Sequence, residues 1–202
     1  MDTVLFTQRV EVIESYGERR DCADQNIARF IHTCGFLPVP VPNIKEIAVQ
    51  MLIKLEPVGI VLTGGNSFVK YGGDAPERDV AEKGILQFCI KNNIPVYGFC
   101  RGMQVILDYF GCKLEEVQGH AGVRHKLLKP IGSKDTNSFH NQGCFQINPP
   151  LVAEAWAGDG VIEAVTCQKY NILGTMWHPE REKVFREEDI IMVQDLFKRG
   201  CN

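Results

Sequence analysis

Strand-like and helix-like segments alternate along the first half of this chain, and this alternation restricts the possible folds more than any other feature. Four short apolar runs have the pattern of buried strands: Thr3–Gln8, Phe36–Val41, Val58–Leu62 and Ile94–Gly98. Four helix-like segments follow them: one capped by Asp21 and ended by Gly35, one capped by Asn43 and extending to Leu55, then Arg78–Asn92 and Arg101–Phe110. The alternation predicts an α/β fold, with a mostly parallel sheet and helices on both faces.

The second half of the chain has a different pattern. From about Cys112 to Met176 we expect short, turn-rich β segments, which include Cys144–Asn148, Val161–Cys167 and Ile172–Met176. A last helix is expected over Glu187–Arg199. No internal repeat or linker interrupts the 202 residues, so we expect residues 1–202 to form a single domain with a small β-rich section.

Charge and composition exclude several classes of protein. The net charge of −3 is too balanced for general binding to nucleic acid or anionic membranes, and no apolar run is long enough to span a bilayer. The first residues lack the basic and apolar regions of a secretory signal. The eight cysteines include no C-x-x-C pair, which argues against a zinc ribbon and favours reduced thiols. We therefore expect a soluble, cytoplasmic protein with no metal site.

One cysteine stands in a pattern that suggests a nucleophile. Cys100 lies between a predicted strand and a predicted helix in the frame Gly98-x-Cys100-x-Gly102, the thiol counterpart of a serine nucleophile elbow. The helix N-terminus favours the thiolate, and the amide of Arg101 is placed to stabilise an oxyanion. The alternative is one more buried core cysteine, but glycines on both sides of a strand–helix junction favour the elbow.

A second glycine pair and one histidine could complete the site. Gly64-Gly65 ends a predicted strand and could bring bare backbone to a ligand, although an ordinary turn would also fit. Of the five histidines, His178 directly follows a predicted strand, and Pro179 favours extended backbone there. Residues i and i+2 of an extended segment lie on the same side, so Glu180 could orient the imidazole. The tripeptide alone is weak evidence, but its place after the last strand strengthens it.

Two segments together make the chain recognisable. Gly98-Phe99-Cys100-Arg101-Gly102-Met103-Gln104 and Trp177-His178-Pro179-Glu180 resemble the class I glutamine amidotransferase superfamily. Within it, the chain is similar to the free-standing γ-glutamyl-γ-aminobutyrate hydrolase branch, through Tyr16–Asp21, Arg78-Asp79 and Asn137–Gly143. The resemblance implies a flavodoxin-like sheet, a Cys100/His178/Glu180 triad and an oxyanion hole of Gly65 and Arg101 amides. It also implies a γ-glutamyl pocket that includes Gln104 and Gly64.

The chain departs from that branch in its short loops between Leu62 and Arg78 and between Cys112 and Asn137. Its size and the Tyr16–Asp21 motif resemble enzymes that hydrolyse γ-glutamyl-CDP-amidate to L-glutamate and cytidine diphosphoramidate in capsule biosynthesis. Such a substrate calls for arginines, which suit phosphate oxygens. Arg19 and Arg20 are the first candidates, and the others are Lys70, Arg78, Arg101 and Arg124, although each could be a solvated surface charge. Asn137, Ser138 and His140 could bind the substrate's α-amino and α-carboxylate groups, or could form a capped turn.

Three functions fit these motifs. The first is a hydrolase of a γ-glutamyl amide, either the nucleotide conjugate or another amine such as γ-glutamyl-γ-aminobutyrate. The second is a glutaminase subunit of a separate synthetase, which would use the same triad. The third is a catalytically silent binding protein, which has no need of Cys100, His178 and Glu180 together. We favour the hydrolase, with a small-molecule substrate, no cofactor and no obligatory protein partner.

Overall fold

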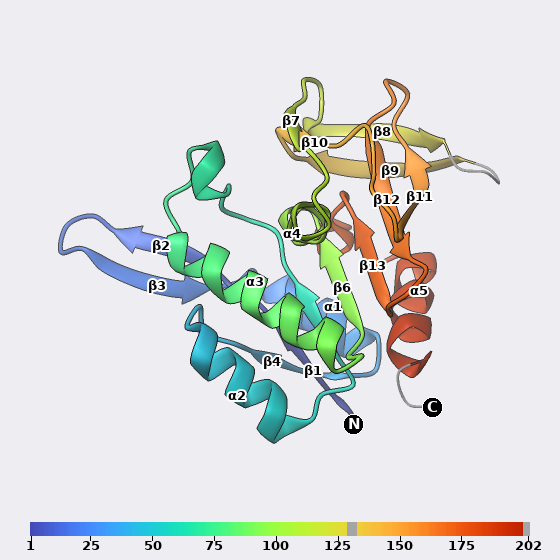
Figure 1. Ribbon diagram of the computed structural model, residues 1–202. Coiled ribbons are helices and arrows are strands. Elements are labelled where there is room, and N and C mark those ends of the chain that lie inside the picture. Colours follow the sequence, from blue (N-terminus) through green and yellow to red (C-terminus); the bar gives the residue numbers. More distant parts are fainter. Residues whose placement is uncertain (129–132, 200–202) are drawn as a thin grey trace.

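A nine-stranded mixed sheet forms the centre of the computed structural model, which describes residues 1–128 and 133–199 (Figure 1). Across the sheet the strands are β4 (Leu37–Pro40), β1 (Thr3–Phe6), β5 (Gly59–Leu62), β6 (Val96–Phe99), β13 (Ile172–Thr175), β12 (Ile162–Cys167), β11 (Leu151–Trp156), β8 (Ala121–Leu128) and β9 (Ser133–Phe139). The strands from β4 to β13 pair in parallel, and those from β13 to β9 pair antiparallel. The predicted α/β class is therefore confirmed, with the β-rich section continuing the main sheet.

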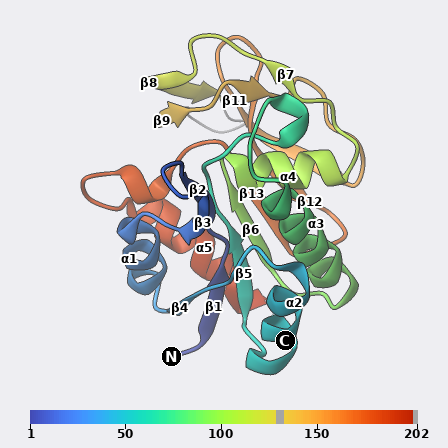
Figure 2. The same ribbon diagram turned by 90° about the vertical axis from the view of Figure 1, so that its left-hand side faces the viewer.

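Helices cover both faces of the parallel strands (Figure 2). One face packs against α1 (Gln25–Thr33) and α5 (Glu187–Arg199), through a core that includes Phe30 and Phe197. The other face packs against α2 (Lys45–Leu55), α3 (Pro76–Lys91) and α4 (Arg101–Tyr109), through a core that includes Leu52 and Ile106. Because both faces are covered, β5 and β6 are buried along their whole length, which explains their continuous apolar runs.

Several short elements complete the described chain. A hairpin of β2 (Arg9–Ile13) and β3 (Glu18–Cys22) extends away from the sheet (Figure 1), and β7 (Glu115–Glu116) pairs with β10 (Gln142–Gly143). Two short 3₁₀ helices are η1 (Val69–Tyr71) and η2 (Pro179–Arg181). The strands β8 and β9, at the antiparallel edge of the sheet, lie across those ends of the parallel strands at which β6 terminates (Figures 1 and 2). Among the described residues, no helix is long and apolar enough to cross a membrane.

Some local expectations are wrong, because the residues concerned form contacts with distant parts of the chain instead. Asp24, not Asp21, caps α1, accepting a hydrogen bond from the amide of Asn26 at 2.8 Å. Asp21 instead accepts from the Asn43 amide at 2.9 Å and the Asn43 side chain at 2.6 Å, so Asn43 is no helix cap either. The expected strand Cys144–Asn148 is irregular, and the paired strand ends at Gly143.

The cysteines of the described residues are all free thiols, and five of the seven are buried. Burial raises the pKa of Cys34 and Cys89 to about 12, so these two behave as small apolar core residues. Cys201 lies outside the described residues.

Candidate active site

Cys100 lies in a sharp turn between β6 and α4. Its φ of +51° is rare for a residue with a side chain, so the surrounding structure must hold it there. The two flanking glycines make the turn possible, because neither position has room for a Cβ atom. A Cβ on Gly98 would lie 2.6 Å from the carbonyl of Gly102, and a Cβ on Gly102 would lie 2.0 Å from the Leu62 oxygen. The Cys100 amide donates to the carbonyl of Thr175 at 2.7 Å, which fixes the elbow to β13.

His178 and Glu180 form a buried hydrogen-bonded pair just beyond β13. Nδ1 of His178 lies 2.6 Å from Oε1 of Glu180, which leaves Nε2 as the ring nitrogen available to a reacting group. Burial lowers the pKa of His178, but the neighbouring Cys100 and Glu180 raise it more, to about 9. The rings of Phe99 and Phe139 enclose the imidazole, with centroids 5.5 and 5.6 Å away.

Gly64 lies beside both Cys100 and His178. A Cβ on Gly64 would lie 2.7 Å from Cε1 of His178 and 3.5 Å from Cβ of Cys100. The first distance is too short for any side chain, so the glycine at this place has a steric reason. The structure thus brings Cys100 next to His178 and Glu180, which lie far from it along the chain.

Two backbone amides could stabilise an oxyanion beside Cys100. Arg101 is the first residue of α4, and the first amides of a helix have no intrahelical acceptor. Gly65 follows β5 with a φ of +91°, a conformation that favours glycine. Both residues line an open cleft of about 230 Å³ that also contains Cys100, Gln104 and the segment 139–142.

A second, smaller hollow adjoins this cleft at Gly65. Its volume is about 90 Å³, and its lining includes Gly64, His178 and Glu180 together with Arg9 and Arg181. Cβ of Arg9 lies 3.1 Å from the Cβ position on Gly65. The Arg181 guanidinium lies 4.4 Å from the ring centroid of Phe139 and is 39% exposed.

Sequence analysis missed these two arginines as candidates for a leaving-group site. Arg9 follows β1 at the carboxyl edge of the sheet, where open α/β folds bind ligands, and Arg181 directly follows Glu180. Both signals were present in the sequence, but an arginine after a strand is too common to be singled out without the fold.

The other basic candidates have partners elsewhere. Arg78 and Arg101 are 0% and 1% exposed and bind Glu82 inside the molecule, so neither guanidinium lines the mouth, which corrects their assignment. Lys70 pairs with Asp108. Arg124 pairs with Asp135 and Glu182.

Arg19 and Arg20 lie on the hairpin that extends away from the sheet. Arg19 binds Glu77 at 2.6 Å and Arg20 binds Glu18 at 2.7 Å. Their guanidinium groups are already occupied by carboxylates, which weakens their assignment to a phosphate.

The side chains of Asn137, Ser138 and His140 also have internal partners. Asn137 donates to the carbonyl of His178 at 2.8 Å and accepts from its amide at 2.9 Å, so it positions the histidine's backbone. The Ser138 hydroxyl donates to the His120 carbonyl at 2.6 Å. His140 faces Glu163 and the carbonyl of Gln142. Of these three residues, only His140 lines the cleft, which argues against direct substrate binding by the side chains of Asn137 and Ser138. Gln104 also lines it and donates to the Gln142 carbonyl at 3.0 Å.

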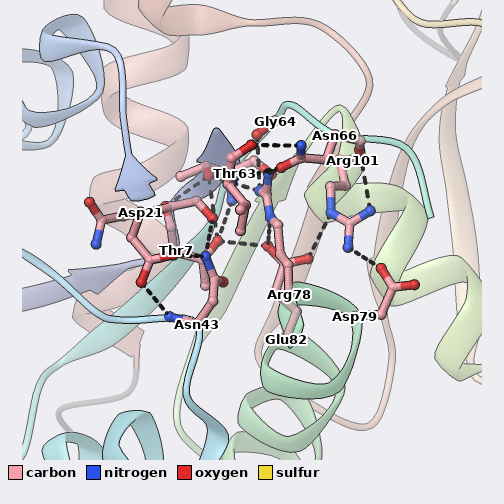
Figure 3. Close-up of polar contacts among 12 residues, drawn as sticks. Thr7, Asp21, Asn43, Thr63, Gly64, Asn66, Arg78, Asp79, Glu82 and Arg101 are labelled. Carbon is pink, nitrogen blue, oxygen red and sulfur yellow. Dashed lines mark hydrogen bonds and ion pairs between the residues drawn. The ribbon is translucent and has the colours of Figure 1, made fainter. Parts of the chain in front are cut away.

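A buried ion network supports both candidate oxyanion positions (Figure 3). Glu82 accepts from Arg78 at 2.9 Å and from Arg101 at 3.0 Å. Arg78 also donates to the carbonyls of Thr63 and Gly64, at 2.8 and 2.9 Å. The network therefore ties the loop after β5 to the start of α4.

Comparison with known proteins identifies the family of the chain. The family model described as peptidase C26 matches residues 5–130 and 116–180. A γ-glutamyl-CDP-amidate hydrolase from Campylobacter jejuni is 32% identical over 183 residues, covering 88% of this chain and 89% of that protein. The γ-glutamyl-γ-aminobutyrate hydrolase PuuD of Escherichia coli K12 is 30% identical over 192 residues, with 74% of each chain covered.

A solved structure shares the fold. A putative GMP synthase subunit from Thermoplasma acidophilum has a TM-score of 0.74 and 16% identity, and the match covers 100% of this chain and 95% of that one. The resemblance inferred from the motifs is thereby confirmed. This chain belongs to the peptidase C26 family and has the flavodoxin-like class I glutamine amidotransferase fold.

Proposed function

We propose that this protein hydrolyses γ-glutamyl amides through a Cys100–His178–Glu180 triad. The observation that carries the proposal is the contact at Gly64, where the elbow cysteine and the Glu180-bound imidazole approach one position. A nucleophile, a base and an orienting group in this arrangement are what acyl transfer requires. The peptidase C26 family and the two relatives named above support the same reaction class.

In this mechanism, Cys100 attacks the γ-carbonyl and forms a tetrahedral intermediate. Its oxyanion lies on the amides of Gly65 and Arg101. His178, protonated at neutral pH because its pKa is about 9, gives its proton to the leaving nitrogen, and a γ-glutamyl thioester remains. His178 then takes a proton from water, which attacks the thioester and releases glutamate and the thiol. The reaction uses no cofactor.

The finer proposal is a substrate with a large anionic leaving group, γ-glutamyl-CDP-amidate. The Campylobacter jejuni relative supports it, since the match spans most of both chains. Arg9 and Arg181 support it on chemical grounds, because both line the hollow beside the reacting groups. Because they line the hollow, they come before Arg19 and Arg20 as candidates for contact with the phosphates, although Arg9 also lies 3.7 Å from Glu11 and Arg181 lies 3.6 Å from Glu180. On this proposal the enzyme acts in the cytoplasm on a small molecule, in capsule biosynthesis, and without an obligatory protein partner.

Kinetics on three substrates test both claims, the hydrolysis of γ-glutamyl amides and the preference for the nucleotide-linked substrate. We expect kcat/KM for γ-glutamyl-CDP-amidate to exceed that for glutamine by at least about 10²-fold, a difference of about 2.7 kcal/mol in transition-state binding. γ-Glutamyl-γ-aminobutyrate should fall between them. Cys100→Ser should abolish turnover of all three, and Cys167→Ser, a half-buried thiol on β12, serves as the control.

Arginine variants then locate the leaving-group site. Arg9→Ala should reduce the preference for the nucleotide substrate and leave glutamine hydrolysis unchanged. Arg181→Ala should reduce the same preference, measured as the ratio of the two kcat/KM values, because Nε of Arg181 lies 3.6 Å from Oε1 of Glu180 and its loss acts on both substrates. Arg29→Ala, on the exposed side of α1, should change neither. Similar rates on all substrates would contradict the nucleotide proposal. Strong activation of glutamine hydrolysis by a separate synthetase would instead favour a glutaminase that serves that synthetase.

A further inference from the structure

Three histidines converge on one buried carboxylate behind the cleft. His120 precedes β8, His125 lies on β8, His140 follows β9, and Glu163 lies on β12. One oxygen of Glu163, Oε1, lies 3.2 Å from Nδ1 of His120, 3.6 Å from Nε2 of His125 and 3.3 Å from Nε2 of His140. Glu163 is 0% exposed and His120 is 3% exposed. The proposed reaction uses none of these side chains, although His140 lines the cleft.

The protons of His120 are arranged as in a metal-ligating histidine. Its Nε2 lies 2.9 Å from a carboxylate oxygen of Asp159, which can only accept, so Nε2 carries the hydrogen. In the neutral ring Nδ1 then has a lone pair, and it points into the cluster without a hydrogen bond. Metal-bound histidines commonly give their other N–H to a carboxylate in this way.

Two further atoms of the cluster are buried without a hydrogen-bond partner among the described residues. They are Nε2 of His125 and Oε2 of Glu163. Buried polar atoms without partners are costly, and several that face one another call for a shared cation.

We propose that His120, His125 and Glu163 bind a divalent transition-metal cation of the zinc class. Their three ligand atoms lie within 4.8 Å of one another. In a tetrahedral zinc site with bonds of about 2.0–2.1 Å, ligand atoms are about 3.3 Å apart. The distances of 3.2 and 3.6 Å from Glu163 to the two histidines fit that geometry. Imidazole and carboxylate ligands suit zinc, and a water molecule would fill the fourth position.

The metal would brace the wall of the active-site cleft. The carbonyl of His120 accepts hydrogen bonds from the Ser138 hydroxyl and the His140 amide, at 2.6 and 3.0 Å. The carbonyl of Glu163 accepts from the amide of Met176 at 2.8 Å, two residues before His178. Ligation would therefore join the β8–β9 hairpin to β12 beside the catalytic segment. His140, at 3.3 Å from Glu163, would hold the carboxylate in place. The proposal differs from our expectation from the sequence, which was a protein without a metal site.

Metal binding to tag-free, chelator-treated protein tests the proposal. The background is Cys100→Ser, so that the candidate nucleophile cannot bind the metal, and the result is independent of whether the proposed activity exists. Equilibrium dialysis against Zn²⁺ should give one equivalent per chain. Co²⁺ should give the intense visible absorption of a tetrahedral site with nitrogen and oxygen ligands. Zn²⁺ should also raise the melting temperature.

The variants distinguish this site from any other. His125→Ala should lose at least about tenfold in affinity, the size expected when a ligand or its support is removed. His125 is chosen because it is only half-buried, and circular dichroism checks that the variant folds. Glu163→Gln, which keeps the shape of the side chain, should lose affinity likewise, and His32→Ala, an exposed histidine on α1, should retain it. No bound metal, equal affinity in folded His125→Ala, or thiolate-to-cobalt charge-transfer bands would overturn the proposal.

Discussion

At the scale of single residues, the candidate site depends on the rare backbone conformation of Cys100 and on the close approach of His178 to Gly64. Cys100 has a φ of +51°, which separates it from the buried thiols of the core. The approach is at Gly64, whose missing Cβ leaves room for His178. Both features position the candidate reacting groups. The backbone conformation costs stability, as is common at functional sites, and the close approach excludes a side chain at position 64.

Gly64→Ala tests the close approach. The added methyl would lie 2.7 Å from Cε1 of His178, so the imidazole must move. A displacement on the order of 1 Å costs about 10²-fold in rate, and we expect kcat to fall by about that factor with little change in melting temperature. Gly158→Ala is the matched control, because nothing lies within 4 Å of its Cβ position. Wild-type kcat in Gly64→Ala would show that the imidazole is not at the reacting position.

Glu180→Gln tests the charge state of the imidazole. The pKa of His178 is raised from 6.5 to about 9, against burial, by Cys100 and Glu180. The protonated form is therefore present at neutral pH and is lost above pH 9, so kcat/KM should decline with a midpoint near pH 9. Glu180→Gln removes a charged partner, so this midpoint should move to lower pH. An unchanged pH profile in this variant would contradict the role of Glu180.

At the scale of elements, a network of buried charges joins α3, α4 and the loop after β5. Arg78 and Glu82 lie one turn apart on α3, and Arg101 begins α4 (Figure 3). Burial raises the pKa of Glu82, but the two arginines outweigh burial and hold that pKa below its usual range. The stabilisation is therefore present above the ordinary carboxyl pKa and is lost as the pH falls through the lowered value.

Glu82→Gln should destabilise the protein strongly. The substitution leaves two buried guanidinium groups facing an amide, and breaking a buried ion pair costs about 3–5 kcal/mol. Urea unfolding at neutral pH measures the loss. Glu46→Gln, an exposed glutamate on α2, should change the free energy of unfolding by no more than about 0.5 kcal/mol. Equal stability of the two variants would mean that Glu82 is not held as an ion pair.

At the scale of the whole molecule, one sheet connects the parallel and antiparallel halves, with β13 as the shared strand. It pairs in parallel with β6 and antiparallel with β12. The candidate nucleophile follows β6 and the imidazole follows β13, so the site depends on this single pairing. A continuous sheet should unfold as one unit, which is our expectation for residues 1–202.

Two spectroscopic probes test that expectation. Both tryptophans, Trp156 and Trp177, lie in the antiparallel half, whereas α1 to α4 pack on the parallel strands. Tryptophan fluorescence and far-ultraviolet circular dichroism should therefore give the same urea midpoint if the halves unfold together. Two separate midpoints would show two domains instead of one.

The sequence alone determined the parallel half of the fold and indicated the candidate reacting residues. Buried strands such as Val58–Leu62 and helices such as Arg101–Phe110 follow from local apolar spacing, which a few consecutive residues define. The glycines around Cys100 and the proline after His178 are local signals as well. The motifs also identified the family, which the comparisons confirmed.

Only the tertiary structure decided which polar side chains face the site. Asp21 and Asn43 have the sequence of helix caps but bind each other, and the guanidinium groups of Arg78 and Arg101 are buried on Glu82 and do not line the mouth. His120, His125 and Glu163 likewise meet only in the folded chain, the two histidines from β8 and the residue before it, and the carboxylate from β12. The physical reason is that hydrogen bonds and ion pairs between distant segments outweigh local preference, because a buried polar group without a partner is costly.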